Sequence, residues 1–315
     1  MAGFIGLDVG GTYLKGARIA ESGEIEARLH EPIVRERPED LLAQFERAVA
    51  ALRGVIPLRA VGIGLPGIVD HPTERLRGVP NLPALAALQE CDLGAEVAKR
   101  VGRPAFIEND ANAAGMAEAW RGAGQGAASI VFLTLGTGVG GAVILRERLW
   151  TGRSGYAGEM GHVQLDPDGE VCGCGVRGCL ETVVGNGGWV RRAERKLQSR
   201  ASILAGQALE PASIVAAARE GDPVAIEVVD ETTRALGQAL GGLINILNPE
   251  RAVIGGGVAA AGAFLLDRIV RDTKGRCWPQ AFEDCSFRLA ALGGDAGVVG
   301  AARVAMAGVE GGLRA

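Results

Sequence analysis

The sequence has few aromatic residues, few lysines and no long apolar stretch. Phe, Trp and Tyr make up 4% of the 315 residues, and only four residues are lysine. Because a membrane-spanning helix needs about 18 or more consecutive apolar residues, the sequence excludes one. The first residues, MAGFIGLDVGG, contain no basic stretch followed by a small-residue cleavage site, so we expect no secretory signal. With a net charge of -4 and both signs of charge scattered along the chain, we expect a cytoplasmic protein that binds neither nucleic acid nor membranes.

Glycine, by contrast, is abundant and gathers in turns that follow strand-like segments. The chain holds 49 glycines, and glycine lets the backbone approach a ligand closely. The motif Asp8-Val9-Gly10-Gly11-Thr12 begins at the end of the apolar segment 4–9. Its unobstructed backbone amides and its hydroxyl suit phosphate, and its carboxylate suits hydrated Mg²⁺. An ordinary hairpin turn is equally typical of so short a motif. A second turn in similar surroundings, Gly136-Thr137-Gly138, favours two phosphate-binding hairpins.

A third glycine cluster, Gly255-Gly256-Gly257, follows the apolar strand-like segment 251–254. We expect a helix to begin near Ala259, so that bare backbone and a helix N-terminus meet at the carboxyl end of a strand. This is a common place for a nucleotide. Such a turn taken alone is more often structural, and the first two glycine turns are what favour a nucleotide-binding role.

Strand-like and helix-like segments alternate along the chain, which predicts an α/β architecture. The length of 315 residues favours two domains. The order strand, glycine turn, strand occurs around both of the first two turns, which indicates an internal duplication with a boundary near residues 117–127. We therefore predict an N-terminal α/β domain at residues 1–118 and a C-terminal α/β domain at residues 119–296.

Four metal-ligating side chains have the spacing of a zinc site. They are His162, Cys172, Cys174 and Cys179, in the pattern H-x9-C-x-C-x4-C, with several glycines between them. Three thiolates and one imidazole complete a tetrahedral coordination sphere and leave no open position for catalysis. Disulfides are disfavoured in the cytoplasm. We therefore expect these four residues to hold a structural Zn²⁺ in the loop 159–181, with metal binding coupled to folding of the loop.

The pair Asn109-Asp110 lies between the strand-like segment 105–107 and the helix-like segment 111–120. An aspartate at such a junction can accept the proton of a substrate hydroxyl. Helix capping is the alternative, because Asn and Asp are favoured capping residues. Glu159 and Glu181 flank the cysteine loop and could reach a polyhydroxylated ligand, although acidic residues are more often solvated surface.

Together these motifs resemble the ROK family of repressors and kinases, especially its bacterial glucokinases. The resemblance runs from Gly6 to the end of the chain, with the motifs in the family's order and spacing. The matching segments are 8–12 with Lys15, 64–67 (GLPG), 108–112 (ENDAN), 135–141 (LGTGVGG), 159–162 (EMGH) and 172–181 (CGCGVRGCLE). The resemblance implies a two-domain, actin-like ATPase (ribonuclease-H-like) fold with an interdomain cleft and a structural zinc loop. It also implies that a C-terminal helix, 297–315, packs back on the first domain.

The activity that the resemblance implies is ATP-dependent phosphorylation of a hexose hydroxyl. Glucose is the expected sugar, because AGEMGH at 157–162 is most similar to the glucokinase pattern. Asp110 is then the catalytic base, and one ring nitrogen of His162 faces zinc while the other faces the sugar. The implied sugar contacts are Asn81, Asn109, Glu159, His162 and Glu181. The implied contacts to ATP and Mg²⁺ are Asp8, Gly10, Gly11, Thr12, Lys15, Gly136, Thr137, Gly138, Gly255, Gly256 and Gly257.

Several alternatives stay open within and outside this activity. Kinases of N-acetylglucosamine, N-acetylmannosamine and fructose share the motifs. A non-catalytic sugar-sensing module is the alternative of another class, disfavoured because Asp8, Asp110 and both hairpins are intact. The family's repressors carry a DNA-binding domain before this fold, and we expect none here because the first phosphate strand starts at residue 4. A zinc-ribbon module is disfavoured by the surrounding α/β pattern. The resemblance also implies a homodimer or homotetramer.

Overall fold

The computed structural model describes residues 3–79 and 81–312. These residues form a mixed α/β protein with two five-stranded sheets and one two-stranded sheet, which confirms the predicted fold class. The chain folds into two compact units. Unit 1 takes in the described residues up to 128, residues 142–158 and the described residues from 291 onward, and unit 2 takes in residues 129–141 and 159–290. Within the described ranges, no helix has the length and apolar character needed to span a membrane.

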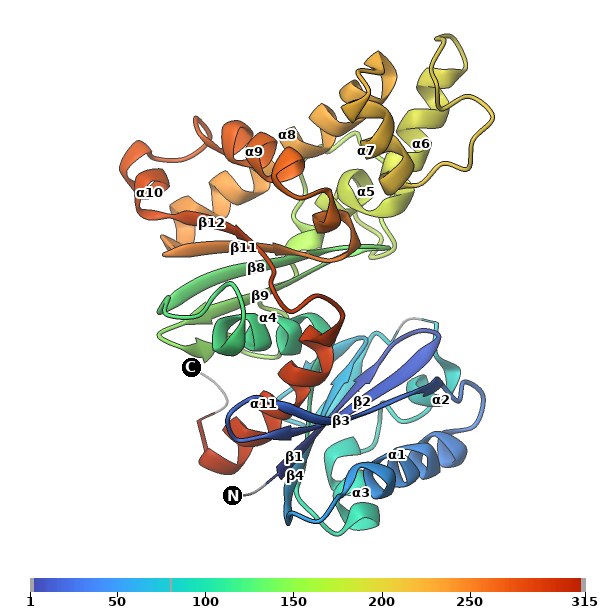
Figure 1. Cartoon of the computed structure of the whole chain (residues 1–315), viewed down its shortest axis with the longest axis vertical. Helices are drawn as coiled ribbons and strands as arrows, with labels where there is room; N and C mark the ends of the chain where they lie inside the picture. Colours follow the sequence, from blue (N-terminus) through green and yellow to red (C-terminus); the bar gives the residue numbers. More distant parts are fainter. Residues whose placement is uncertain (1–2, 80, 313–315) are drawn as a thin grey trace. The chain divides into compact units, whose positions relative to one another are not determined.

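Figure 1 labels the elements, whose bounds are as follows. The strands are β1 (Gly3–Val9), β2 (Tyr13–Ala20), β3 (Ile25–Pro32), β4 (Leu58–Leu65), β5 (Ile68–Asp70), β6 (Arg75–Arg77), β7 (Ala105–Asn109), β8 (Ser129–Leu135), β9 (Val139–Leu145), β10 (Arg148–Leu149), β11 (Arg251–Gly255) and β12 (Ser286–Leu289). The helices are α1 (Pro38–Leu52), α2 (Pro83–Ala86), α3 (Leu93–Val101), α4 (Asp110–Arg121), α5 (Leu180–Val184), α6 (Asn186–Leu197), α7 (Pro211–Arg219), α8 (Pro223–Leu247), α9 (Ala263–Thr273), α10 (Pro279–Asp284) and α11 (Ala296–Glu310). Three short 3₁₀ turns are η1 (Met160–His162), η2 (Gly257–Ala261) and η3 (Gly293–Asp295).

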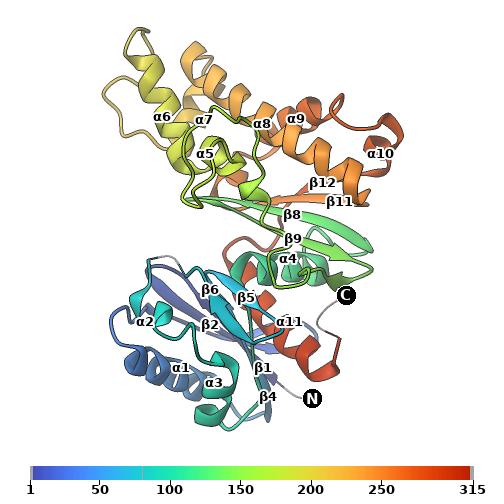
Figure 2. The ribbon, with the colours of Figure 1, turned by 180° about the vertical axis from the view of Figure 1, so that it is seen from behind.

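The sheet of unit 1 has the strand order β3-β2-β1-β4-β7. Strands β1, β2 and β3 are antiparallel neighbours, whereas β1, β4 and β7 run parallel. Side chains alternate between the two faces of a strand. Ile5 and Leu7 of β1 therefore join a core with Phe45 of α1, while Phe4 joins a separate core with Val299 of α11. Figures 1 and 2 show α1 and α3 on one face of this sheet and α4 and α11 on the other.

Helix α11 rests directly on the backbone of the first sheet. A β-carbon added at Gly62 of β4 would lie 1.7 Å from the carbonyl oxygen of Ala301, and one at Gly6 of β1 would lie 2.0 Å from that of Val298. Only glycine leaves room for so close an approach. The approach also brings the first turn of α11 to the carboxyl end of β1, where a β-carbon at Gly297 would meet the Asp8 carboxylate.

The second sheet repeats the plan of the first, with the order β10-β9-β8-β11-β12. Strand β8 takes the place of β1: the hairpin strands β9 and β10 lie on one side of it, and the parallel strands β11 and β12 lie on the other. The repeat confirms the internal duplication predicted from the two glycine turns. In both views the helices α5 to α9 of unit 2 gather on one side of β8, β11 and β12 (Figures 1 and 2).

Candidate active site

The parallel strands of unit 1 bring three motif residues to one edge of the sheet. Asp8 of β1 pairs in register with Gly64 of β4, and Gly64 pairs with Glu108 of β7. The carboxyl ends of parallel strands are the usual ligand-binding edge of an α/β sheet. Burial raises the pKa of the Asp8 carboxyl, and the positive charge of Lys15, its cross-strand partner on β2, acts in the opposite direction. The edge thus presents a carboxylate that a cation would stabilise.

The first glycine turn connects β1 to β2. The Gly10 amide donates to the Tyr13 carbonyl at 3.0 Å, which closes the turn, and Gly11 and Thr12 are exposed. The space around a β-carbon position on Gly11 is open to at least 4 Å. A phosphate group therefore has room beside these amides, and their role in binding one stays a prediction.

Arg35 joins this turn to the segment that contains Asn81. Its guanidinium donates to the Gly11 carbonyl through Nη1, and to the Asn81 carbonyl through Nη2 at 2.6 Å. Asn81 is exposed and has a φ of 52°, a left-handed conformation that Asn tolerates. The sequence carries no signal for this role of Arg35, because the three contacting residues lie far apart along the chain and no local pattern connects them.

The junction of β7 and α4 holds the predicted catalytic pair. Asn109 is the N-cap of α4, since its Oδ1 accepts the Asn112 amide at 3.0 Å, and its Nδ2 donates to the Gly67 carbonyl at 2.9 Å. The capping alternative is therefore correct for Asn109. Asp110 is the first residue of the helix, and its Oδ1 accepts the amide of Ala111 at 2.8 Å. Capping by Asn109 leaves Asp110 in the first turn, where the helix dipole favours a carboxylate.

In unit 2, the second glycine turn connects β8 to β9 and lies against Glu181. The Gly136 amide donates to the Gly138 carbonyl at 3.0 Å, and Glu181 Oε2 accepts the Val139 amide at 2.9 Å. A β-carbon at Gly138 would lie 2.4 Å from this oxygen, so any larger residue there would displace the carboxylate from the turn. Glu181, predicted as a sugar contact, thus also fixes the turn.

The third glycine cluster lies beside the second turn. Gly256 has a φ of 84°, and a β-carbon there would lie 2.2 Å from the carbonyl oxygen of Leu135, the residue before Gly136. The expected helix start near Ala259 is wrong: the 3₁₀ turn η2 occupies residues 257–261, and α9 begins at Ala263. A second left-handed glycine, Gly262 with φ 65°, separates the two. The backbone amides that follow β11 therefore belong to the 3₁₀ turn η2 and not to the first turn of an α-helix.

The side chains of His162, Cys172, Cys174 and Cys179 converge, with one ligand atom from each lying within 4.8 Å of all the others. The sulfurs of Cys174 and Cys179 are 3.6 Å apart, and the Cys172 sulfur lies 3.5 Å from His162 Nδ1. Zn–S bonds of about 2.3 Å in a tetrahedron place two sulfurs about 3.8 Å apart, so the donor set and its spacing fit zinc. Burial raises the pKa of the Cys179 thiol to about 12, whereas the Val176 amide lowers that of Cys174.

Two further predicted sugar contacts adjoin this cluster. His162 Nε2, the ring nitrogen opposite the cysteines, lies 3.6 Å from Glu159 Oε2. The pKa of Glu159 is raised, mainly because the carboxyl is buried. The nearby Glu181 carboxylate also raises this pKa, whereas His162 acts in the opposite direction. Glu181 Oε1 lies 3.6 Å from the Cys172 sulfur. Unit 2 thus brings Glu159, His162 and Glu181 together around the cysteines, whereas Asn81, Asn109 and Asp110 belong to unit 1.

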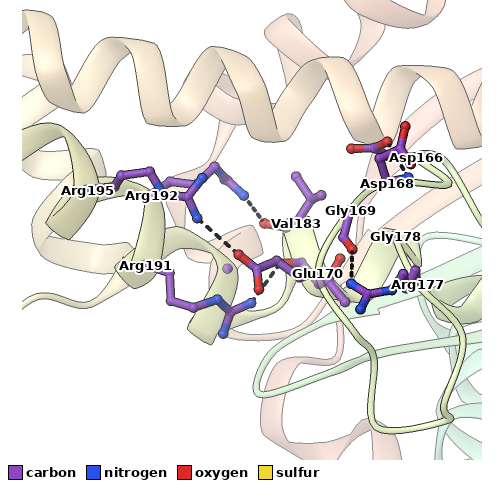
Figure 3. A pocket seen from close by; sticks show the side chains of 12 residues that line it. Asp166, Asp168, Gly169, Glu170, Arg177, Gly178, Val183, Arg191, Arg192 and Arg195 are labelled. Atoms are coloured by element: carbon purple, nitrogen blue, oxygen red, sulfur yellow. Dashed lines mark hydrogen bonds and ion pairs between the residues drawn. The ribbon is translucent and has the colours of Figure 1, made fainter.

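A separate cavity of about 460 Å³ lies on unit 2 between the cysteine loop and α6. Figure 3 shows its arginines directed at groups of the protein itself: Arg195 Nη2 lies 3.0 Å from Glu170, and Arg177 donates to the Gly169 carbonyl at 3.4 Å. Arg191 donates to the Thr182 carbonyl at 3.0 Å. None of the predicted site residues lines the cavity.

Comparisons with known proteins place the chain in a family. The sequence pattern of the ROK family matches residues 4–307. A glucokinase of Thermotoga maritima is 36% identical over 307 residues, which are 95% of this chain and 96% of that protein. An N-acetylmannosamine kinase of Haemophilus influenzae is 31% identical over 303 residues, 95% of this chain and 93% of that protein. The crystal structure of a ROK family glucokinase from Streptomyces griseus, in complex with glucose and AMPPNP, superposes with a TM-score of 0.80 at 34% identity and covers 97% of this chain and 99% of that one.

Proposed function

The chain belongs to the ROK family, and on that basis we propose that it transfers the γ-phosphoryl group of ATP to glucose and forms glucose 6-phosphate and ADP. The observation that carries the proposal is the Asp110 carboxylate at the carboxyl end of β7, at the same edge of the sheet as Asp8 and the first glycine turn of β1, with β4 between the two strands. Similarity over nearly the whole chain to a protein named glucokinase supports glucose as the sugar.

In this proposal Asp110 accepts the proton of the attacking hydroxyl. The hydroxyl oxygen then forms a bond to the γ-phosphorus while the bond from that phosphorus to the ADP oxygen breaks, so the reaction depends mainly on positioning and charge stabilisation. Asn109 keeps one N–H of its amide on Gly67 and offers the other to the sugar. Glu159, His162, Glu181 and Asn81 supply the remaining proposed sugar contacts.

The glycine turns bind the nucleotide in this proposal. Gly10, Gly11 and Thr12 receive phosphate oxygens on unit 1, with Lys15 nearby, and 136–138 with 255–257 form the nucleotide site of unit 2. Mg²⁺, when bound, neutralises charge on the phosphates, and Asp8 is the residue that would hold its water shell. The partly buried Asp8 carboxylate, with its raised pKa, is suited to a cation.

We propose that the cluster of His162 and the three cysteines holds a structural Zn²⁺. The fit of its distances to a tetrahedron supports this, as does the turn that shapes the loop: Gly178 has a φ of 65°, and a β-carbon there would lie 1.5 Å from the Asp166 carbonyl. Bound zinc would keep the thiols deprotonated and fix the orientation of the His162 ring. The chain's own contact between His162 Nε2 and Glu159 then aligns both side chains for the sugar.

A kinase of N-acetylhexosamines is the second candidate, favoured by the N-acetylmannosamine kinase relative at 31% identity. The relative named glucokinase is more similar, at 36%, which favours glucose. ADP release with Mg-ATP, measured against glucose, N-acetylglucosamine, N-acetylmannosamine, mannose and fructose, separates the two. We expect the highest kcat/KM with glucose, and a preference for an N-acetylated sugar would refute that choice.

The experiment that tests the mechanism is Asp110→Asn. We expect kcat to fall by about 10²–10⁴-fold, because the base is lost, while calorimetry still detects glucose binding. Asp92→Asn is the matched control, since Asp92 also stands at a helix start of unit 1, where it caps α3 through the Ala95 amide. Full turnover in Asp110→Asn would remove Asp110 from the role of base. No turnover by the wild-type protein on any sugar, with sugar binding intact, would favour the non-catalytic sensor.

The oligomeric state and the cytoplasmic location stay predictions. A homodimer or homotetramer is the expected state, and light scattering coupled to size-exclusion chromatography measures it directly.

A further inference from the structure

A buried carboxylate lies directly behind the Asn109–Asp110 junction. Glu108 is the residue before Asn109 in β7, and it is 1% exposed. Alternation along the strand turns its side chain to the face opposite that of Asn109. Glutamate is almost never fully buried unless it is paired, because burial of an unpaired charge is costly. The partners of this carboxylate therefore indicate what it does.

Those partners lie on both sides of Asp110 in the sequence. Glu108 Oε1 accepts the backbone amide of Asn109 at 2.9 Å and the side-chain amide of Asn112 at 3.0 Å. Asn112 lies in the first turn of α4 and is 2% exposed. One oxygen thus binds the residue before Asp110 and a residue two positions after it. The direction in which the helix leaves the strand, and with it the direction of the Asp110 side chain, depends on this contact.

The second oxygen of Glu108 meets a histidine from another segment. His71 directly follows β5, and its Nε2 lies 3.4 Å from Glu108 Oε2, with 7% of its side chain exposed. The turn before β5 is tied to the same junction, because the Gly67 carbonyl accepts the side-chain amide of Asn109. The segment 67–71 therefore contacts the junction at two points, through Gly67 and through His71.

We propose that His71 and Glu108 form a positioning pair for the catalytic junction, which sets the geometry of Asp110 without touching the substrate. Glu108 orients the residues around Asp110, and His71 holds Glu108 in the rotamer that makes both Oε1 contacts. A displacement of the order of 1 Å in a catalytic group can cost about 10²-fold in rate, so the pair matters for turnover. This inference rests on the proposed role of Asp110 as the base.

The test compares two substitutions of His71 in the full-length protein. His71→Leu removes the polar partner of Glu108, whereas His71→Gln keeps an N–H at a similar distance from the backbone. We expect His71→Leu to lower kcat with glucose about tenfold or more, by the geometric argument above, and His71→Gln to stay within about threefold of wild type. The KM for ATP should change less than about twofold in both, because the contacts described above join the pair to Asn109 and Asn112 at the junction of β7 and α4.

Glu108→Gln and Asp222→Asn complete the set. Glu108→Gln retains one acceptor oxygen for the Asn109 and Asn112 amides, so most of kcat should survive. Asp222 is the matched control in unit 2: it is 6% exposed and caps α8 by accepting the Ala225 amide at 2.9 Å. Asp222→Asn should lower the melting temperature and leave kcat per folded molecule unchanged.

Three outcomes decide the inference. A lower kcat in His71→Leu, with recovery in His71→Gln and an unchanged KM for ATP, supports it. A His71→Leu protein that melts earlier but turns over at the wild-type rate below its melting point overturns it and leaves the pair a purely structural contact. Equal losses in the Leu and Gln variants also overturn it. Failure of the proposed function looks different, because the wild-type protein itself would then not phosphorylate glucose.

Discussion

Glu118 offers the sharpest test of how unit 1 is held together. It lies on α4 and is 0% exposed. Its carboxylate accepts three backbone amides: those of Ala123 at 2.8 Å, Ala291 at 3.0 Å and Leu292 at 2.8 Å. Ala123 lies in the segment through which the chain leaves α4, and Ala291 and Leu292 lie where it comes back toward α11. One side chain therefore joins the segment after α4 to a segment that begins 173 positions beyond Glu118 in the sequence.

The expected loss follows from the number of amides involved. A buried donor deprived of its acceptor costs about 1–3 kcal/mol, so Glu118→Ala would remove about 3–9 kcal/mol, a large part of the total stability of a typical domain. Glu118→Gln is the milder change, because one oxygen survives while the new NH₂ group faces amide donors. We expect a loss of about 2–4 kcal/mol, which corresponds to roughly 4–16 °C in melting temperature for a unit of this size.

Thermal unfolding followed by circular dichroism or calorimetry measures this loss. Glu194→Gln on α6 is the matched control, since Glu194 is an exposed helical glutamate and its substitution should shift the melting temperature by less than about 2 °C. If Glu118→Gln melts within that same margin of the wild-type protein, the carboxylate does not hold the two segments, and the reasoning from its contacts is wrong.

Three further predictions test other parts of the structure. Gly62→Ala places a β-carbon 1.7 Å from the Ala301 carbonyl oxygen and should destabilise the protein by about 1–3 kcal/mol or more; denaturant titration measures this, and wild-type stability would contradict the packing of α11. Zinc removal by a chelator should lower the melting temperature, because the cluster that includes Cys179 then loses its cross-link; elemental analysis should find one zinc per chain, and metal-free protein of unchanged stability would contradict the site. Lys15→Met should raise the pKa of Asp8, because burial already raises it and Lys15 opposes that effect. The fall of kcat/KM for Mg-ATP at acidic pH should therefore begin at a higher pH in this variant. If it begins at the same pH as in the wild-type protein, ionisation of Asp8 does not control Mg²⁺ binding.

The fold could be predicted well where apolar runs end in glycine turns. The strand that carries Asp8 and the strand that runs into the Gly255–Gly257 cluster both appear as expected, because an unbroken apolar run is typical of a strand buried on both faces. Strand β3 could not be found in this way. It covers residues 25–32 at the edge of the first sheet, and its apolar and polar side chains alternate between half-buried and exposed positions, so it contains no apolar run.

Candidate site residues could be chosen from the sequence only where a short motif contains the groups that the chemistry needs. Asp110 and the zinc ligands lie in short segments whose spacing carries the chemistry. The capping alternative is realised for Asn109, and its place in the catalytic pair stays a prediction. Arg35 and Glu118 were missed because their partners lie far away in the sequence: Arg35 bonds to Asn81, 46 positions on. Such contacts follow from tertiary packing, which no local pattern encodes.

The close seating of α11 on Gly6 and Gly62 has a consequence for how the protein is made on the ribosome. Phe4, Ala60 and Ala117 bury their side chains against this helix, yet it begins only at Ala296. At about 5–20 residues per second, synthesis from the end of α4 to the start of α11 takes roughly 10–35 s. During that time the face of the first-made sheet that α11 covers has only α4 as native cover, so unit 2 can complete its fold before unit 1 does. Nascent-chain lengths that stop short of α11 should therefore be the ones that engage chaperones.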